Sequence, residues 1–247
     1  PNLKKTMKKA IFYLSLCTLI GVSCGKDDDG SGNPPPGSTS YMDTSTGGIR
    51  NYAFKNNNPI TPEENFTQTA TNRDTMVAGK SYKVFTNSNG GNSYYNITPV
   101  TGGNDYYTQL TLSGLGTMVD PITNLYLKDY VNTGGTWANG PYTFNVDFGG
   151  TTVPLSVTLN NQMVASNASR TVRGNNYSGV RHVKTTVSAV VGTPPISTPV
   201  TGLFSDINSY YAPRYGLIEN STILSIDFMG IQDSVNTQTF LLSATLP

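Results

Sequence analysis

His182 is the only histidine in the 247-residue chain, and imidazole is the side chain most often used to move protons near neutral pH. The residues that follow it alternate, which places Val183, Val187 and Val191 on one face of an expected strand. His182 then lies on the opposite face with Lys184, and this predicts an exposed histidine rather than a lone general base. The chain also contains no Gly-x-Ser-x-Gly elbow, phosphate loop or dinucleotide fingerprint.

The carboxylates form a second set of candidates, because two of them on either side of a bond can hydrolyse a glycoside. The sequence positions of the acidic residues give no reason to pair any two of them as catalytic groups. No further histidine or cysteine is present to complete a zinc site. We therefore expect a protein that is not an enzyme and that holds no metal or cofactor. The acidic candidates are Glu63, Glu64, Asp105, Asp129, Asp147, Asp206, Glu219, Asp227 and Asp233.

Neighbouring tyrosines beside Gly- and Asn-rich loops are the strongest sign of binding. An aromatic ring offers an apolar face and a polar tip, which suits stacking on a glycan or contact with a protein. The alternative is that each pair straddles a strand, with one ring in the core and the other outside. The candidate contact residues are Tyr94, Tyr95, Tyr106, Tyr107, Trp137, Tyr210 and Tyr211.

Residues 1–24 have the order of a secretory signal. Met7, the expected start, is followed by lysines, and 13 almost wholly apolar residues then run from Ala10 to Val22. That stretch is shorter than the ~20 residues that cross a bilayer. The small residues before Cys24 resemble a lipobox, which implies that the Cys24 thiol carries a lipid after cleavage. The alternative is plain secretion with an incidental cysteine.

Residues 25–40 are expected to connect this anchor to the folded part. Lys26 with Asp27, Asp28 and Asp29 resembles the export signal of surface lipoproteins in the Bacteroidota, which implies an outer-membrane protein that faces the cell exterior. A calcium loop is the rival interpretation, but the distal glutamate of that pattern is missing. Three prolines among Gly and Ser then predict a semi-rigid spacer.

The charge balance argues against a nucleic-acid partner. Beyond Cys24 the chain has 12 basic and 15 acidic residues, so its formal charge is slightly negative. Binding to a phosphate backbone depends on an excess of Lys and Arg. The membrane is therefore the only partner that the sequence names directly, through the lipid anchor.

Residues 41–247 are expected to form one all-β domain, a large antiparallel sheet shaped as a half-barrel or a sandwich. The 33 Thr and 15 Tyr suit a half-buried pleated surface, whereas Glu occurs only three times. Two alternating runs, 142–148 and 153–159, are joined through a Gly-Gly pair and predict a hairpin. Pro154 predicts an edge or a bulge there. The best helix candidates are short, namely residues 124–131 and 204–210.

Two segments share the pattern Val-x-Gly-x-x-Tyr, one starting at Val77 and the other at Val172. A strand is expected after each of them. The pattern has two explanations, a shared turn chemistry or a duplicated half-sheet.

Three segments, residues 74–84, 126–137 and 210–218, together resemble a family of surface lipoproteins in the Bacteroidota. The last is similar to the Tyr-Tyr-Ala-Pro-Gly-Val-Gly-Leu turn of that family, with Arg214 and Tyr215 where Gly and Val are common. The resemblance implies a sheet similar to the half-barrels of the LolA/LolB-type lipoprotein carriers. A shared fold does not by itself assign a function.

Two tripeptides carry a further resemblance. The segments that begin at Asp74 and Asp233 are similar to the short O-glycosylation acceptor of exported Bacteroidota proteins. This resemblance implies sugars on Thr75 and Ser234.

Together these features predict a lipid-anchored surface protein whose β domain binds a glycan, a lipid or a protein and catalyses nothing. A carrier with an apolar ligand in a concave sheet is one rival, and it requires an apolar lining without packed cover. A structural or adhesive component is another, favoured by an aromatic patch without a pocket. A hydrolase requires two carboxylates or a Ser-His pair in a cleft.

Overall fold

The computed structural model describes residues 40–110, 113–114, 117–118, 122–148, 151–193, 195–228 and 231–247. The expected signal peptide, Cys24, the export signal Lys26–Asp29 and the spacer up to residue 39 lie outside these residues. Every regular element in the described part is a β-strand, which confirms the expected all-β class. The described part contains no helix that could span a membrane.

The strands follow one another closely along the chain. They are β1 (Ile49–Asn56), β2 (Glu64–Val77), β3 (Lys80–Asn87), β4 (Asn92–Val100), β5 (Gly103–Leu110), β6 (Ser113–Gly114), β7 (Thr117–Met118), β8 (Ile122–Lys128), β9 (Thr136–Phe148), β10 (Thr151–Val172), β11 (Asn175–Thr193), β12 (Ile196–Pro199), β13 (Leu203–Ala212), β14 (Gly216–Phe228) and β15 (Ile231–Thr245).

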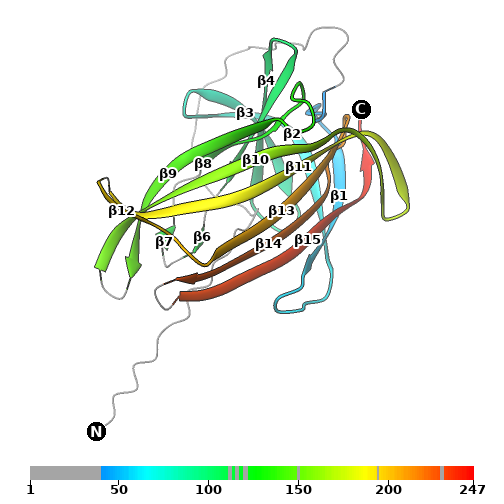
Figure 1. The fold of residues 1–247 in the computed structure, drawn as a ribbon. Helices are drawn as coiled ribbons and strands as arrows, with labels where there is room; N and C mark the ends of the chain where they lie inside the picture. Colours follow the sequence, from blue (N-terminus) through cyan, green and yellow to red (C-terminus); the bar gives the residue numbers. More distant parts are fainter. Residues whose placement is uncertain are drawn as a thin grey trace.

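One antiparallel sheet contains most of these strands, in the order β8-β5-β4-β3-β2-β1-β15-β14-β13-β11-β10-β9 (Figure 1). β12 pairs with β11, and β6 and β7 form a separate small sheet. Tyr126 on β8 and Tyr211 on β13 are far apart in this order, yet their ring centroids are 5.2 Å apart. The sheet therefore curls until it is nearly closed into a barrel, and both rings lie on its concave face.

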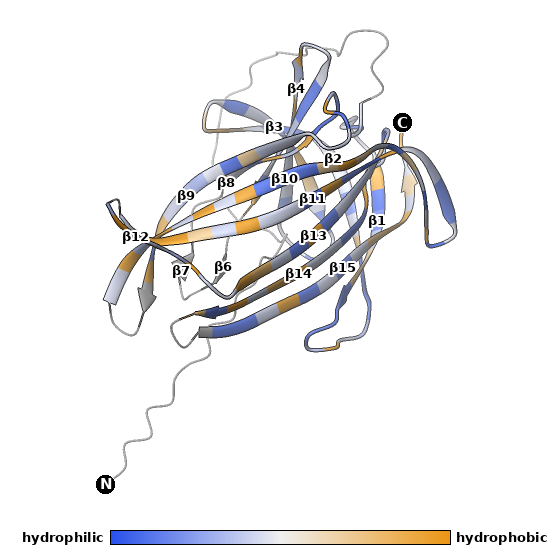
Figure 2. Cartoon of the chain, viewed as in Figure 1, coloured by the Kyte–Doolittle hydropathy of each residue, from blue (hydrophilic) through white to orange (hydrophobic). Residues whose placement is uncertain are grey.

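The hairpin expected from the alternating runs is formed by β9 and β10, in which Val146 opposes Val153 and Phe144 opposes Leu155. Figure 2 shows the alternation of apolar and polar residues along these strands and along β11. Pro154 lies just before Leu155, where the register between β10 and β11 begins. Its missing N–H group therefore interrupts no pairing with β11.

Both expected helices are wrong, because residues 122–128 form β8 and residues 203–212 form β13. In β13 two serines occupy inward positions and hide the period of two. Ser205 accepts a hydrogen bond from the Val187 N–H group, and Ser209 accepts one from Asn220. In β8 a bulge opposite Tyr106 and Tyr107 breaks the alternation.

The two Val-x-Gly-x-x-Tyr segments form the same kind of turn, a two-residue hairpin connection. The central residues have positive φ in both, which is the geometry of a type I′ turn. The φ values are 49° at Ala78, 77° at Gly79, 49° at Arg173 and 84° at Gly174. Shared turn chemistry thus accounts for the motif, and duplication of a half-sheet stays a hypothesis.

Residues 40–48, here called the strap, cross one end of the barrel before β1 begins. Met42 bridges Tyr215 in the turn between β13 and β14. Gly47 donates to the Ala70 carbonyl, and the Ala70 N–H group donates back to Gly48. The strap thus connects that turn to β2, next to the C-terminus in Figure 1. We call this the strap end of the barrel, and the opposite end the free end.

The tip of the long β10–β11 hairpin packs against β13, β14, β15 and β1. Arg170 near this tip forms a two-pronged ion pair with Glu219 on β14, with N–O distances of 2.6 and 2.8 Å. Asn175 at the start of β11 donates to the Leu242 carbonyl at 3.2 Å. These contacts hold the hairpin tip beside the strap end.

Candidate functional site

Tyrosine rings fill the concave face at the strap end. The Tyr126 ring centroid lies 6.3 Å from that of Tyr95, 6.1 Å from Tyr106 and 5.2 Å from Tyr211. Burial raises the pKa of Tyr95, Tyr126 and Tyr211 above the ordinary value, because a phenolate is disfavoured away from water. These hydroxyls therefore stay protonated at neutral pH and act as hydrogen-bonding groups. The buried members of this cluster also include Tyr41, Met42, Ala70, Phe85, Leu127, Met163 and Val183.

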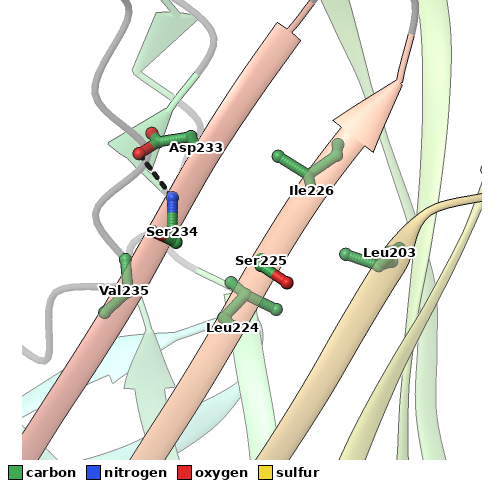
Figure 3. Close-up of a pocket in the computed structure, with 7 residues that line it drawn as sticks. All are labelled: Leu203, Leu224, Ser225, Ile226, Asp233, Ser234 and Val235. Atoms are coloured by element: carbon green, nitrogen blue, oxygen red, sulfur yellow. Dashed lines mark hydrogen bonds between the residues drawn. The ribbon is translucent and has the colours of Figure 1, made fainter. Parts of the chain in front are cut away.

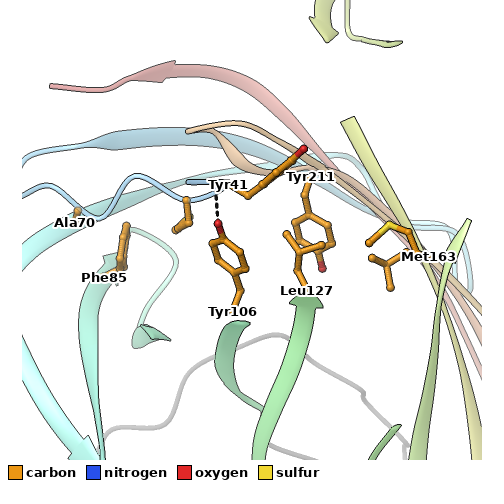
Figure 4. Packing of buried hydrophobic residues seen from close by; sticks show 9 residues of the cluster. Tyr41, Ala70, Phe85, Tyr106, Leu127, Met163 and Tyr211 are labelled. Atoms are coloured by element: carbon orange, nitrogen blue, oxygen red, sulfur yellow. Dashed lines mark hydrogen bonds between the residues drawn. The ribbon is translucent and has the colours of Figure 1, made fainter. Parts of the chain in front are cut away.

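Tyr106 joins the strap to the sheet. Its hydroxyl accepts a hydrogen bond from the Tyr41 N–H group at 2.9 Å (Figure 4). It donates one to Asp129 at 2.8 Å. The same carboxylate accepts from the Asn104 N–H group at 2.6 Å and from its side chain at 2.8 Å. Burial, strengthened by Asp129, raises the Tyr106 pKa. The hydrogen bonds of Tyr106 and Asp129 thus hold the strap against the sheet.

Arg50 is completely buried at this end. Its Nε donates to the Tyr215 carbonyl at 2.7 Å, and its Nη2 donates to the Asp43 and Arg214 carbonyls at 2.7 and 3.0 Å. Its guanidinium carbon lies 5.6 Å from the Phe85 ring centroid. Nη1 has no hydrogen-bond partner among the described residues. Arg50 was not among the residues expected from the sequence. The signal that could have found it is its spacing, since Arg50 stands two residues before the inward Tyr52 and therefore faces the concave side.

The free end is mainly apolar. Leu110 on β5 packs here against residues of β9, β10 and β11, so the cluster spans the concave face. Tyr142 packs against this cluster, and its hydroxyl donates to the Thr123 carbonyl. The buried members are Val146, Leu155, Val157, Leu159 and Val200, and the partly buried ones include Phe144, Val153, Leu203, Ile226 and Phe228.

A small pocket opens at the free end between β13, β14 and β15 (Figure 3). The cavity volume is only about 10 Å³. That is about the volume needed to hold a single water molecule. The pocket is therefore a shallow apolar depression, and an acyl chain would need the side chains around it to move apart. It is lined by Leu203, Leu224, Ser225, Ile226, Asp233, Ser234 and Val235.

Side chains of β9, the strand at one edge of the sheet, bind β8, the strand at the other edge. The Trp137 indole N–H group donates to the Leu125 carbonyl on β8 at 2.8 Å. Asn139 accepts from the Leu125 N–H group at 3.2 Å and donates to Asn124 at 2.9 Å. Trp137, expected as a ligand contact, therefore lies at this seam with its only polar group already bonded.

The three tyrosine pairs straddle the sheet. Tyr95, Tyr106 and Tyr211 belong to the cluster on the concave face, and their neighbours point to the other side. Neither face of Tyr210 is open for stacking, because the His182 ring centroid lies 4.2 Å away and the Arg170 guanidinium lies 3.5 Å from the ring centroid.

The two other outward tyrosines lie on β4 and β5. Lys80 Nζ lies 4.2 Å from the Tyr107 ring centroid, and the Tyr107 hydroxyl donates to Asp105 at 3.4 Å. Tyr94 is half-buried opposite Val84. The structure thus brings Tyr95, Tyr106 and Tyr211 together, and it places Tyr94, Tyr107 and Tyr210 on the other face.

His182 faces away from the concave side, as the alternation predicts, but it is half-buried rather than exposed. Its ring stacks on Tyr210, and Nε2 lies 2.9 Å from the Asn208 side-chain oxygen. Burial lowers the His182 pKa, and the charges of Arg170 and Lys184 lower it further. The imidazole is therefore neutral at pH 7.

The carboxylates do not converge on one site in the described part of the chain. Glu219 pairs with Arg170, Glu63 with Arg173, and Asp206 with Lys184. No three His, Cys, Asp or Glu side chains among the described residues lie close enough to hold a metal ion. The Asp147 side chain is outside the description.

The two residues expected to carry sugars lie on strands. Ser234 on β15 is exposed, and its hydroxyl accepts a hydrogen bond from Asn58 at 2.5 Å. Thr75 on β2 is half-buried and opposes Tyr82. Their glycosylation stays a prediction.

No protein-family model and no curated protein matches this chain. Two solved structures are similar to it. One is a candidate lipoprotein of Parabacteroides distasonis, with 9% identity, a TM-score of 0.40, and coverage of 84% of this chain and 99% of that one. The other is a candidate exported protein with a YmcC-like fold from Bacteroides fragilis, with 7% identity, a TM-score of 0.35, and coverage of 84% and 100%.

Proposed function

We propose that this chain is a lipid-anchored, non-catalytic protein of the outer membrane whose barrel holds an apolar ligand at its free end. The observation that carries the proposal is the pocket of the free end, where partly buried Leu203 and Ile226 line an opening made almost wholly of methyl and methylene groups. Such a lining matches an acyl chain, since apolar surface removed from water contributes about 25 cal/mol per Å².

The anchor part of the proposal is supported by the sequence. The lipobox-like residues before Cys24 favour a lipid on that cysteine, and Lys26–Asp29 favour export to the cell surface. A lipid ligand is favoured over a glycan because the ring faces that a sugar would need are covered at Tyr210 and lie in the core at Tyr95 and Tyr211.

A titration with a fluorescent fatty acid tests the binding. The protein is the full chain with Cys24→Ser, which removes the lipid and keeps every described residue. Leu203→Glu places a carboxylate in the pocket and is expected to weaken binding at least 10-fold. Phe204→Glu is the matched control, because Phe204 is the next residue, points to the opposite face and is 55% exposed.

We expect the control to change the affinity less than twofold. Equal affinities for the two variants would contradict the proposed site. Absence of binding to the parent protein up to the solubility of the probe would contradict the proposed function.

A structural or adhesive role is the second candidate. Phe204 and Ile223 are 55% and 38% exposed, and their positions on β13 and β14 make them diagonal neighbours on the outer face. Phe204→Glu is expected to disrupt such a contact while ligand binding continues. Cross-linking on intact cells, with and without this substitution, measures it.

A further inference from the structure

Arg50 and Gln68 lie directly opposite each other on β1 and β2. Both are buried, with 0% and 4% of their surface exposed. Nη1 of Arg50 and Oε1 of Gln68 each lack a hydrogen-bond partner among the described residues. Because opposed Cβ atoms lie ~4.5–5.5 Å apart in an antiparallel pair, the two side chains leave the backbone side by side.

The charge of Arg50 is not balanced by an acid. Its hydrogen bonds go to three backbone carbonyls, and no carboxylate among the described residues forms an ion pair with it. A buried cation usually has a charged partner, since removal from water disfavours the charged form. The site therefore has a positive charge and a free donor deep in the barrel.

Tyrosine hydroxyls surround this charge. Gln68 Nε2 donates to the Tyr95 hydroxyl at 3.3 Å. Tyr95 and Tyr126 both pack against the core cluster of the concave face, which is the face that a ligand of the barrel would contact.

We propose that the Arg50 guanidinium, beside the Tyr95 hydroxyl, binds an oxyanion, either a carboxylate or a phosphate. A guanidinium Nη–H donor suits either group, and its hydrogen bonds to charged oxygens are stronger than neutral ones. This site deepens the proposed function, on which it rests for the apolar tail. The ligand is then an anionic amphiphile, with its head group at Arg50 and its chain directed toward the free end.

A comparison of three ligands separates the contribution of the head group to binding from that of the tail. Titration calorimetry on the full chain with Cys24→Ser compares dodecanoate, dodecanol and inorganic phosphate. We expect dodecanoate to bind at least 10-fold more tightly than dodecanol. Phosphate that binds as tightly as dodecanoate, with dodecanol inactive, would assign the site to a free anion and overturn the proposed tail.

Gln68→Glu is the sharpest variant, because it supplies a carboxylate opposite Arg50. It is expected to raise the melting temperature and to reduce the preference for dodecanoate over dodecanol to less than threefold. Gln162→Glu is the matched control, since Gln162 is exposed on β10, and it should leave the preference unchanged. Arg50→Lys keeps the charge without the fork and is expected to reduce the preference.

The outcomes distinguish the two proposals. Equal binding of dodecanoate and dodecanol to the parent protein would overturn the oxyanion site and leave the apolar site standing. A folded Gln68→Glu protein that keeps the full preference would also overturn it. Absence of binding by all three ligands would overturn the proposed function together with the head-group site.

Discussion

The strap end and the free end of the barrel are stabilised by different interactions. At the strap end, buried rings carry hydroxyls with fixed partners, as in the chain from Tyr41 through Tyr106 to Asp129. At the free end, the cluster consists mainly of aliphatic side chains, which make no side-chain hydrogen bonds. Hydrogen bonds fix distance and direction, whereas aliphatic contacts tolerate repacking. The strap end is therefore suited to hold one geometry, and the free end to adapt to a ligand.

Two leucine truncations test this difference with the largest expected effect. Leu127→Ala removes a fully buried side chain at the strap end and is expected to cost about 2–5 kcal/mol. Leu203→Ala removes a partly buried one at the free end and is expected to cost less than half as much. Urea unfolding of both variants measures the difference in their free energies of unfolding. Equal losses would show that the two ends do not differ in packing.

A second pair of variants isolates the hydroxyls. Tyr106→Phe leaves the Tyr41 N–H group without its acceptor in a buried site and is expected to cost about 1–3 kcal/mol. Tyr142→Phe removes one bond to the partly buried β8 edge and is expected to cost about 1 kcal/mol. Thermal unfolding of the two proteins compares the two losses of stability. A larger loss for Tyr142→Phe would contradict the greater importance of hydroxyl hydrogen bonds at the strap end.

The smallest expected effect is a pH dependence of the stability. It arises at His182, which faces away from the concave side and belongs to the cluster of neither end. The folded-state pKa of His182 is below the ordinary value of 6.5, so the folded protein disfavours its protonation. Stability is therefore complete above pH 6.5 and decreases as the pH falls below it toward the lowered pKa. We expect a decrease in the free energy of unfolding between pH 7.5 and 5.5, measured with urea.

His182→Gln is the control, and its stability should stay flat over the same interval. Binding of an uncharged probe at the free end should also stay constant, because His182 lies on the other face of the sheet. An unchanged slope in the variant would assign the pH dependence to another group.

The hairpin of β9 and β10 could be predicted because its apolar residues alternate without interruption. β13 could not, since Ser205 and Ser209 occupy inward positions and find partners on β11 and β14. Inward polar residues are invisible to a pattern of hydrophobicity, because their hydrogen-bond partners lie on neighbouring strands that only the fold brings into register. The same reason hid Arg50, whose three acceptors belong to the strap and to the β13–β14 turn.

The amino-acid sequence alone determined the β class and the one-in, one-out placement of the tyrosine pairs, because each depends on neighbouring residues and a period of two. Only the tertiary structure decided which rings meet and at which end the apolar side chains gather. Tyr126 and Tyr211 lie in contact because the sheet curls, and that curl is the sum of small twists over many strands. No local pattern of residues encodes that sum.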